Sequence, residues 1–168
     1  DYDKLMVVNS FSKTFAMTGW RIGYIISPNI EAMKQVIKIQ YYISACSNDA
    51  MQYAVLEAME KANDYPTMMA EEFKQRCDLI VDRLNAMPGV ECQKPKGAIY
   101  VFPRVTVNGM NSQEVAMELL KDGVLCSPGS AFGPSGEGHL RFAYTISQAD
   151  ISRGMDKVEE TLLRLQNA

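Results

Sequence analysis

The sequence lacks the features that mark several common classes of protein. Its longest apolar runs are short, such as the one from Leu5 to Val8, so we expect no helix that spans a bilayer. A net charge of −3 gives no electrostatic reason to expect nucleic acid or an anionic membrane as a partner. No basic segment followed by an apolar stretch opens the chain, so no signal peptide is expected. The first residue is Asp, and a strand pattern begins at once, as it would in a fragment or a processed chain.

Cysteine and histidine are scarce and scattered. The four cysteines lie too far apart for paired metal ligands, and a chain this rich in aliphatic residues needs no disulfide framework: they are Cys46, Cys77, Cys92 and Cys126. The only histidine, His139, has no Cys, Asp or His beside it at metal-ligand spacing. We therefore expect no metal site, reduced thiols and a cytoplasmic location.

The composition is that of a globular protein with a core. Of the 168 residues, 47% are hydrophobic and 22% are charged. Short buried strands are predicted at residues 4–9 and 20–26, with a loop rich in Ser, Thr and Gly between them. Helices are predicted after Ser27-Pro28-Asn29, after Ser47, and from Asp64 to Met87.

After residue 88 the pattern changes to short strands and isolated helices. Strands are expected at residues 90–93, 98–102, 124–127 and 139–145, and helices at residues 111–123 and from 147 onward. We predict that the first two of these strands form a hairpin around the turn at residues 95–97. The fold class predicted is α/β, with residues 1–63 as the remnant of one layer and residues 64–168 as a smaller α+β domain.

One segment combines residue types suited to a specific chemistry. Lys13 follows a predicted buried strand in a loop of small residues, and a lysine whose pKa is lowered forms a Schiff base with an aldehyde. Ser10 and Ser12 flank it, and Arg21 begins the next predicted strand. Hydroxyls and a guanidinium are good ligands for a phosphate dianion. An aldehyde captured beside a phosphate is what pyridoxal 5′-phosphate (PLP) requires.

Each of these residues alone has a simpler explanation. A lysine in such a loop is usually a solvated surface residue, and Arg21 could belong to a structural ion pair. Together, however, residues 10–23 resemble the PLP-attachment signature of class I and II aminotransferases, which have fold type I. The resemblance is nearest to the aspartate and aromatic subgroup. It implies that Lys13 carries PLP and moves protons, and that Ser10, Ser12 and Arg21 anchor its phosphate.

A second segment, residues 127–144, resembles the small domain of the same family. Alternation along the predicted strand puts Leu140 and Phe142 on one face and Arg141 on the other. A surface arginine would be the default reading, but the resemblance implies that Arg141 binds the substrate α-carboxylate. It also places Gly97, in the segment from Pro95 to Tyr100, beside the substrate.

The resemblance implies the C-terminal part of an aminotransferase that moves an amino group between an amino acid and a 2-oxo acid. Residues 1–63 would end the large PLP-binding domain and residues 64–168 would form the small domain. The family works as homodimers, and its large domain begins well before the lysine, so we expect this chain alone to be inactive. Two alternatives stay open: another fold type I PLP enzyme (a C–S lyase, decarboxylase or synthase), and a PLP-binding effector domain of a transcriptional regulator. The amino acid substrate also stays open.

Overall fold

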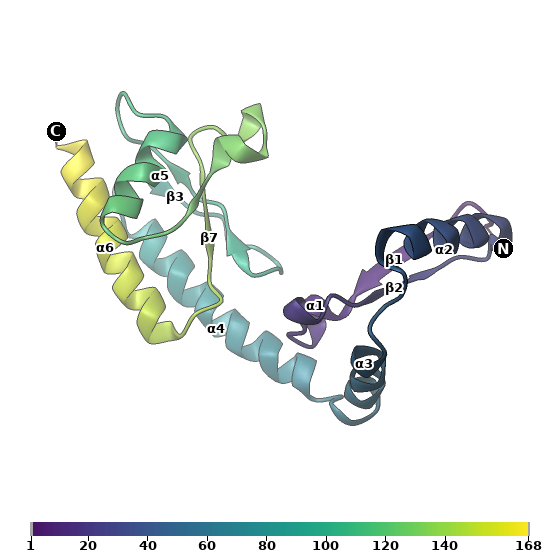
Figure 1. The fold of residues 1–168 in the computed structure, drawn as a ribbon. Coiled ribbons are helices and arrows are strands. Elements are labelled where there is room, and N and C mark those ends of the chain that lie inside the picture. The colour runs from purple at the N-terminus through teal and green to yellow at the C-terminus, as the bar shows by residue number, and fades with distance from the viewer. Residues whose placement is uncertain (1, 168) are drawn as a thin grey trace. The chain divides into compact units, whose positions relative to one another are not determined.

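A computed structural model describes residues 2–167 of the chain (Figure 1). These residues form two compact units, which meet in the sequence between Met69 and Ala70. Within the described range, none of the helices has both the length and the apolar character that a membrane span needs.

The first unit begins with a two-stranded antiparallel sheet, β1 (Val7–Ser10) and β2 (Gly23–Ile26), in which Ser10 lies opposite Gly23. A short helix, α1 (Phe11–Thr14), and a 3-10 turn, Thr18–Trp20, occupy the connection between the strands. A Cβ atom on Gly23 would lie 2.5 Å from the backbone oxygen of Asn9. A side chain at position 23 would therefore force the two strands apart.

The sequence predicts strands that would be buried inside a complete sheet and would expose their apolar faces without it, and the second expectation is confirmed. All residues of β1 and β2 are exposed, including Val8 and Ile26. The physical reason is that a two-stranded sheet with no layer packed on it leaves both faces in contact with solvent. The helices α2 (Ile30–Ser44) and α3 (Asp49–Lys61) begin at the caps Asn29 and Asn48, and Val55 is their one buried residue.

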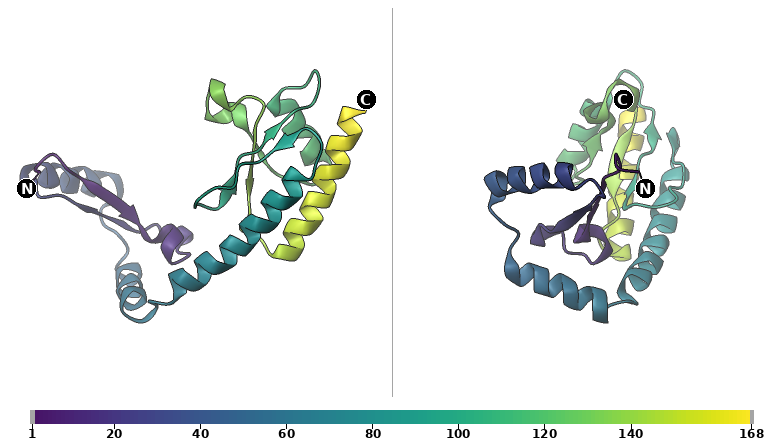
Figure 2. Two further views of the ribbon diagram at one scale, coloured as in Figure 1. Left: turned by 180° about the vertical axis from the view of Figure 1, so that it is seen from behind. Right: turned by 90° about the vertical axis from the view of Figure 1, so that its right-hand side faces the viewer.

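The second unit has its core between three helices and two small sheets. The helices are α4 (Tyr65–Asn85, which begins in the first unit), α5 (Ser112–Lys121) and α6 (Gln148–Gln166). Asn111 begins α5 with a full capping box to Glu114, and Ser147 caps α6. An ion pair from Arg83 to Asp156, 2.6 Å long, joins α4 to α6, which run alongside each other (Figure 2). Fully buried side chains from each helix meet in the core, among them Leu84, Leu119 and Val158.

The strands of this unit pair across long stretches of sequence. β3 (Val90–Glu91) pairs with β5 (Arg104–Val105), and a separate sheet has the order β4 (Tyr100–Val101), β7 (Leu140–Ala143), β6 (Ser127–Pro128), all antiparallel.

The predicted hairpin between residues 90–93 and 98–102 is therefore wrong. The side chain of Asn85 forms hydrogen bonds with both backbone groups of Cys92. Its Oδ1 accepts from the Cys92 N–H at 2.8 Å, and its Nδ2 donates to the Cys92 carbonyl at 3.0 Å. Pro95 then supplies no N–H for a ladder. The strand ends early, and the chain crosses to the other sheet.

Candidate functional site

The connection between β1 and β2 gathers the four residues predicted to hold a cofactor. Ser10 ends β1 and caps α1, because its Oγ accepts from the backbone N–H of Ser12 at 3.1 Å. The Ser10 hydroxyl also donates to the Ser12 Oγ at 2.9 Å. Lys13 follows on the short helix, and Arg21 lies two residues before Gly23, the register partner of Ser10. The hairpin thus brings both ends of the segment together.

The backbone at Arg21 has an unusual conformation. Its φ of 54° and ψ of 54° lie in the left-handed region, which non-glycine residues seldom adopt and which is found at functional sites more often than elsewhere. The Arg21 Nη1 donates to the Thr18 carbonyl at 3.0 Å, and the Thr18 hydroxyl donates to the Ser12 carbonyl at 3.1 Å. These two bonds connect the arginine to the loop that carries the serines.

The donor set of this loop fits PLP. Lys13 is exposed, and its amine has no ion pair or hydrogen bond to any residue in the described part of the chain. A lysine amine without a partner is available to react with an aldehyde, and two hydroxyls and a guanidinium can donate hydrogen bonds to a phosphate. Ser10, Ser12, Lys13 and Arg21 are therefore the residues of this chain that could hold the group.

Arg141 lies in the second unit, and its environment follows the predicted alternation. Leu140 and Phe142 are buried in the core, whereas Arg141, between them, is half-buried on the opposite face of β7. Its Cζ lies 4.6 Å from the ring centroid of Tyr100 and 4.7 Å from that of Phe132. The guanidinium is thus in contact with two aromatic rings, an arrangement that favours a cation.

The polar contacts of Arg141 leave its charge without a counter-ion. One Nη donates to the Ser127 Oγ at 3.2 Å, and no carboxylate of residues 2–167 forms an ion pair with it. A partly desolvated guanidinium that lacks an acidic partner is suited to bind a carboxylate from outside the chain.

Sequence reasoning missed the side chains that orient Arg141. Tyr100 could have been found from its alternation with the buried Val101 on a neighbouring strand. Phe132 and Ser127 gave no such signal, because the loop around them has no periodicity. Gly97 is exposed, and apart from its two chain neighbours no residue has an atom within 4 Å of where a Cβ would stand.

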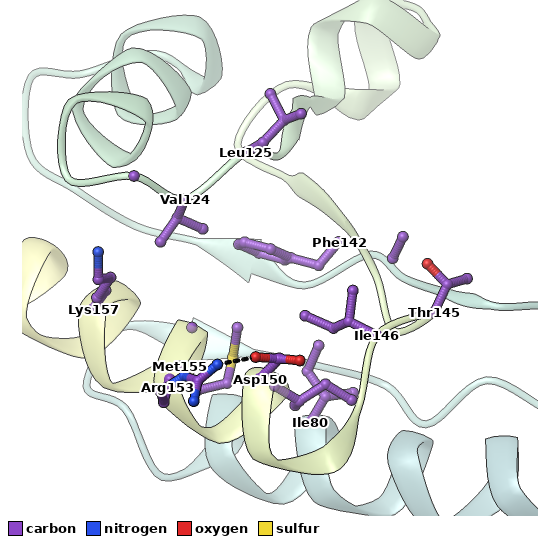
Figure 3. A pocket seen from close by; sticks show the side chains of 14 residues that line it. Ile80, Val124, Leu125, Phe142, Thr145, Ile146, Asp150, Arg153, Met155 and Lys157 are labelled. Carbon is purple, nitrogen blue, oxygen red and sulfur yellow. Dashed lines mark hydrogen bonds and ion pairs between the residues drawn. The ribbon is translucent and has the colours of Figure 1, made fainter.

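A cavity of about 480 Å³ lies between β7 and α6 (Figure 3). Its lining is mostly apolar and includes Val124, Phe142 and Ile146, together with the charged side chains of Arg153 and Lys157. None of the predicted site residues, Arg141 included, lines it.

The sequence of the chain matches a known family model. Residues 1–158 match the model for aminotransferase class I and II, which is nearly the whole chain. The chain belongs to the class I and II aminotransferases. This family is PLP-dependent, which agrees with the donor set of the Lys13 loop.

Individual aminotransferases, known from sequence or from a solved structure, match nearly the whole of this chain. The chain is 37% identical over 163 residues to an aspartate aminotransferase of Pyrococcus horikoshii, with 95% of this chain and 41% of that protein covered. It is 36% identical over 164 residues to aromatic-amino-acid aminotransferase 2 of Thermococcus litoralis, with 96% and 42% covered. A solved aromatic aminotransferase from P. horikoshii has a TM-score of 0.88 at 37% identity, with 95% and 43% covered.

The chain therefore spans between 41% and 43% of the length of these relatives. Over that region it has the mixed α/β, largely helical structure of the fold type I aminotransferases.

Proposed function

We propose that this chain is the C-terminal part of a PLP-dependent enzyme that transfers an amino group between an amino acid and a 2-oxo acid. The observation that carries the proposal is the β1–β2 connection, which puts an uncommitted lysine amine on the same loop as two hydroxyls and an arginine. Residues 1–63 would end the large domain, and residues 64–168 would form the small domain. Because the chain covers less than half of its relatives, we expect it to be inactive alone.

In this proposal the Lys13 loop holds the cofactor. When bound, PLP supplies an aldehyde and a ring that withdraws electrons from the substrate. Lys13 would be the residue that holds the cofactor through its amine, and the same amine could accept and return a proton at the substrate Cα. The Ser10 and Ser12 hydroxyls and the Arg21 guanidinium bind the phosphate.

Arg141 holds the substrate by its α-carboxylate. Its guanidinium has no counter-ion among the described residues and lies against the rings of Tyr100 and Phe132, and a guanidinium can form a two-pronged contact with a carboxylate. Gly97, on the segment that leads to Tyr100, would border the bound substrate. A related structure from Thermus thermophilus, at 30% identity and a TM-score of 0.86, is an aspartate aminotransferase with maleate, a dicarboxylate.

The relatives suggest the class of substrate. Their names include aspartate and aromatic amino acids, so we propose one of these as the amino donor, with a 2-oxo acid as acceptor. We also propose that the complete enzyme is a homodimer.

Borohydride reduction of the complete, PLP-loaded enzyme followed by peptide mapping tests the proposal. The pyridoxyl adduct is expected on Lys13, with Lys4→Ala as a control that keeps the adduct in place. An adduct on another lysine would overturn the assignment. Exchange of an amino acid with a 2-oxo acid, without release of ammonia or pyruvate, is expected, whereas their release would favour a lyase.

A further inference from the structure

Residues 129–138 form the loop that carries Phe132 to Arg141, and the carboxylate of Glu137 fastens this loop to the start of α5. Glu137 Oε1 accepts from the Ser112 backbone N–H at 2.6 Å and from the Gly138 N–H at 2.9 Å, and its Oε2 accepts from the Ser112 hydroxyl at 3.1 Å. The N–H of Ser112 is one of those that a helix leaves unpaired at its first turn. Glu137 satisfies it and places a negative charge at the positive end of the helix.

Ser112 also holds the other end of this loop. It is 4% exposed, its hydroxyl lies 3.1 Å from the Ser130 Oγ, and its Oγ accepts from the Ser130 backbone N–H at 3.3 Å. One buried serine therefore contacts Ser130, near the start of the loop, and Glu137, near its end.

The loop closes on itself through two glycines. A Cβ on Gly129 would lie 2.0 Å from the Gly136 carbonyl oxygen, and a Cβ on Gly136 would lie 2.1 Å from the Gly129 oxygen. These contacts leave no room for a side chain at either position.

Phe132 lies between the two attachment points, and its ring contacts the guanidinium of Arg141. Phe102 packs edge-on against Phe132, with centroids 5.9 Å apart, and stacks on His139 at 5.0 Å. The orientation of the arginine thus depends on where the loop holds Phe132.

We propose that Glu137 is a positioning residue, which keeps the Arg141 guanidinium in place by fastening the 129–138 loop, and with it Phe132, to the start of α5. The consequence for substrate binding rests on the carboxylate role proposed above for Arg141. The positioning itself does not, because it concerns contacts within the chain.

The Nε–H signal of Arg141 in a nitrogen-15 spectrum of the 168-residue chain reports this directly. The rings of Tyr100 and Phe132 shift that signal, and Arg141→Lys assigns it by its loss. Phe132→Ala defines the signal when one ring is absent. Glu137→Ala is expected to move the Arg141 signal toward the position seen in Phe132→Ala.

Glu114→Ala is the matched control. Glu114 is also a carboxylate at the start of α5, but it accepts from the Asn111 N–H and does not contact the loop. It is expected to lower stability while leaving the Arg141 signal unchanged. A Glu137→Ala protein that folds, with the Arg141 signal at its wild-type position, would overturn the proposal. If Glu137→Ala does not fold, Ser112→Ala takes its place, because it removes the hydroxyl that contacts both Glu137 and Ser130. The same shift of the Arg141 signal is expected, and an unshifted signal would overturn the proposal.

Kinetic measurements separate the positioning role of Glu137 from the carboxylate-binding role proposed for Arg141. In the complete enzyme, Glu137→Ala is expected to raise KM for the amino acid several-fold more than it lowers kcat. A moved Arg141 signal with an unchanged KM would support the positioning role and would instead refute carboxylate binding by Arg141.

Discussion

Replacing Arg141 tests the proposed carboxylate site, and the expected loss of kcat/KM can be estimated from the contacts that the replacement removes. In the complete enzyme, Arg141→Ala removes a charged, two-pronged partner, a loss of about 2–5 kcal/mol. At about 1.36 kcal/mol per factor of ten, kcat/KM is expected to fall by about 30- to 5,000-fold. Arg141→Lys keeps the charge but loses one prong and the contact of the guanidinium with Tyr100 and Phe132. One charged hydrogen bond, about 1.5–3 kcal/mol, predicts a fall of about 10- to 160-fold.

The assay is transamination at several amino acid concentrations, with the PLP absorbance recorded for each variant. The absorbance is expected to stay unchanged, because Arg141 lies in a different unit from Lys13 and holds none of the proposed cofactor contacts. Arg104→Ala is the matched control: Arg104 is an exposed arginine of β5, with no ion pair or ring contact among the described residues. It is expected to keep the wild-type kcat/KM.

Two results would refute this reasoning. If kcat/KM were unchanged in Arg141→Ala while PLP affinity fell, Arg141 would bind the cofactor, and its role would have to be exchanged with that of Arg21. If Arg141→Lys kept full activity, the two-pronged contact would be absent.

Three further predictions concern the stability of the protein and the behaviour of this chain by itself. Gly129→Ala, whose Cβ would lie 2.0 Å from the Gly136 oxygen, should lower the free energy of unfolding by about 1–3 kcal/mol. Gly154→Ala, which has open space around it within α6, should raise the free energy of unfolding by about 1 kcal/mol, and denaturant unfolding measures both. The backbone N–H groups of Ser112 and Gly138 lower the pKa of Glu137 below its ordinary value of 4.5, so its stabilisation is present above that pH and is lost as pH falls through the lowered pKa. Melting temperatures in acid should therefore depend less on pH in Glu137→Gln, and an identical pH dependence would contradict this. Absorbance titration of the 168-residue chain should show weak PLP binding and no transamination, and tight binding with turnover would mean that another chain supplies the missing contacts.

The sequence by itself determined the features that depend on neighbours along the chain. Helix starts followed from single capping residues such as Asn29 and Ser147, because a cap satisfies N–H groups two or three residues away. The alternation of Leu140, Arg141 and Phe142 followed from the period of a strand. The order of Ser10, Ser12, Lys13 and Arg21 could likewise be recognised from sequence, because they lie within a dozen residues of one another. The short helix that carries Lys13 and the late start of β2, two residues after Arg21, were not predicted.

Only the tertiary structure decided which strands pair and what surrounds Arg141. The hairpin prediction failed because Asn85, on a helix, takes the backbone groups of Cys92, a competition that no local pattern records. The rings beside Arg141 come from positions 41 and 9 residues away, Tyr100 and Phe132. The exposure of β1 and β2, by contrast, could be expected from the sequence, since a strand is buried only when other layers cover it.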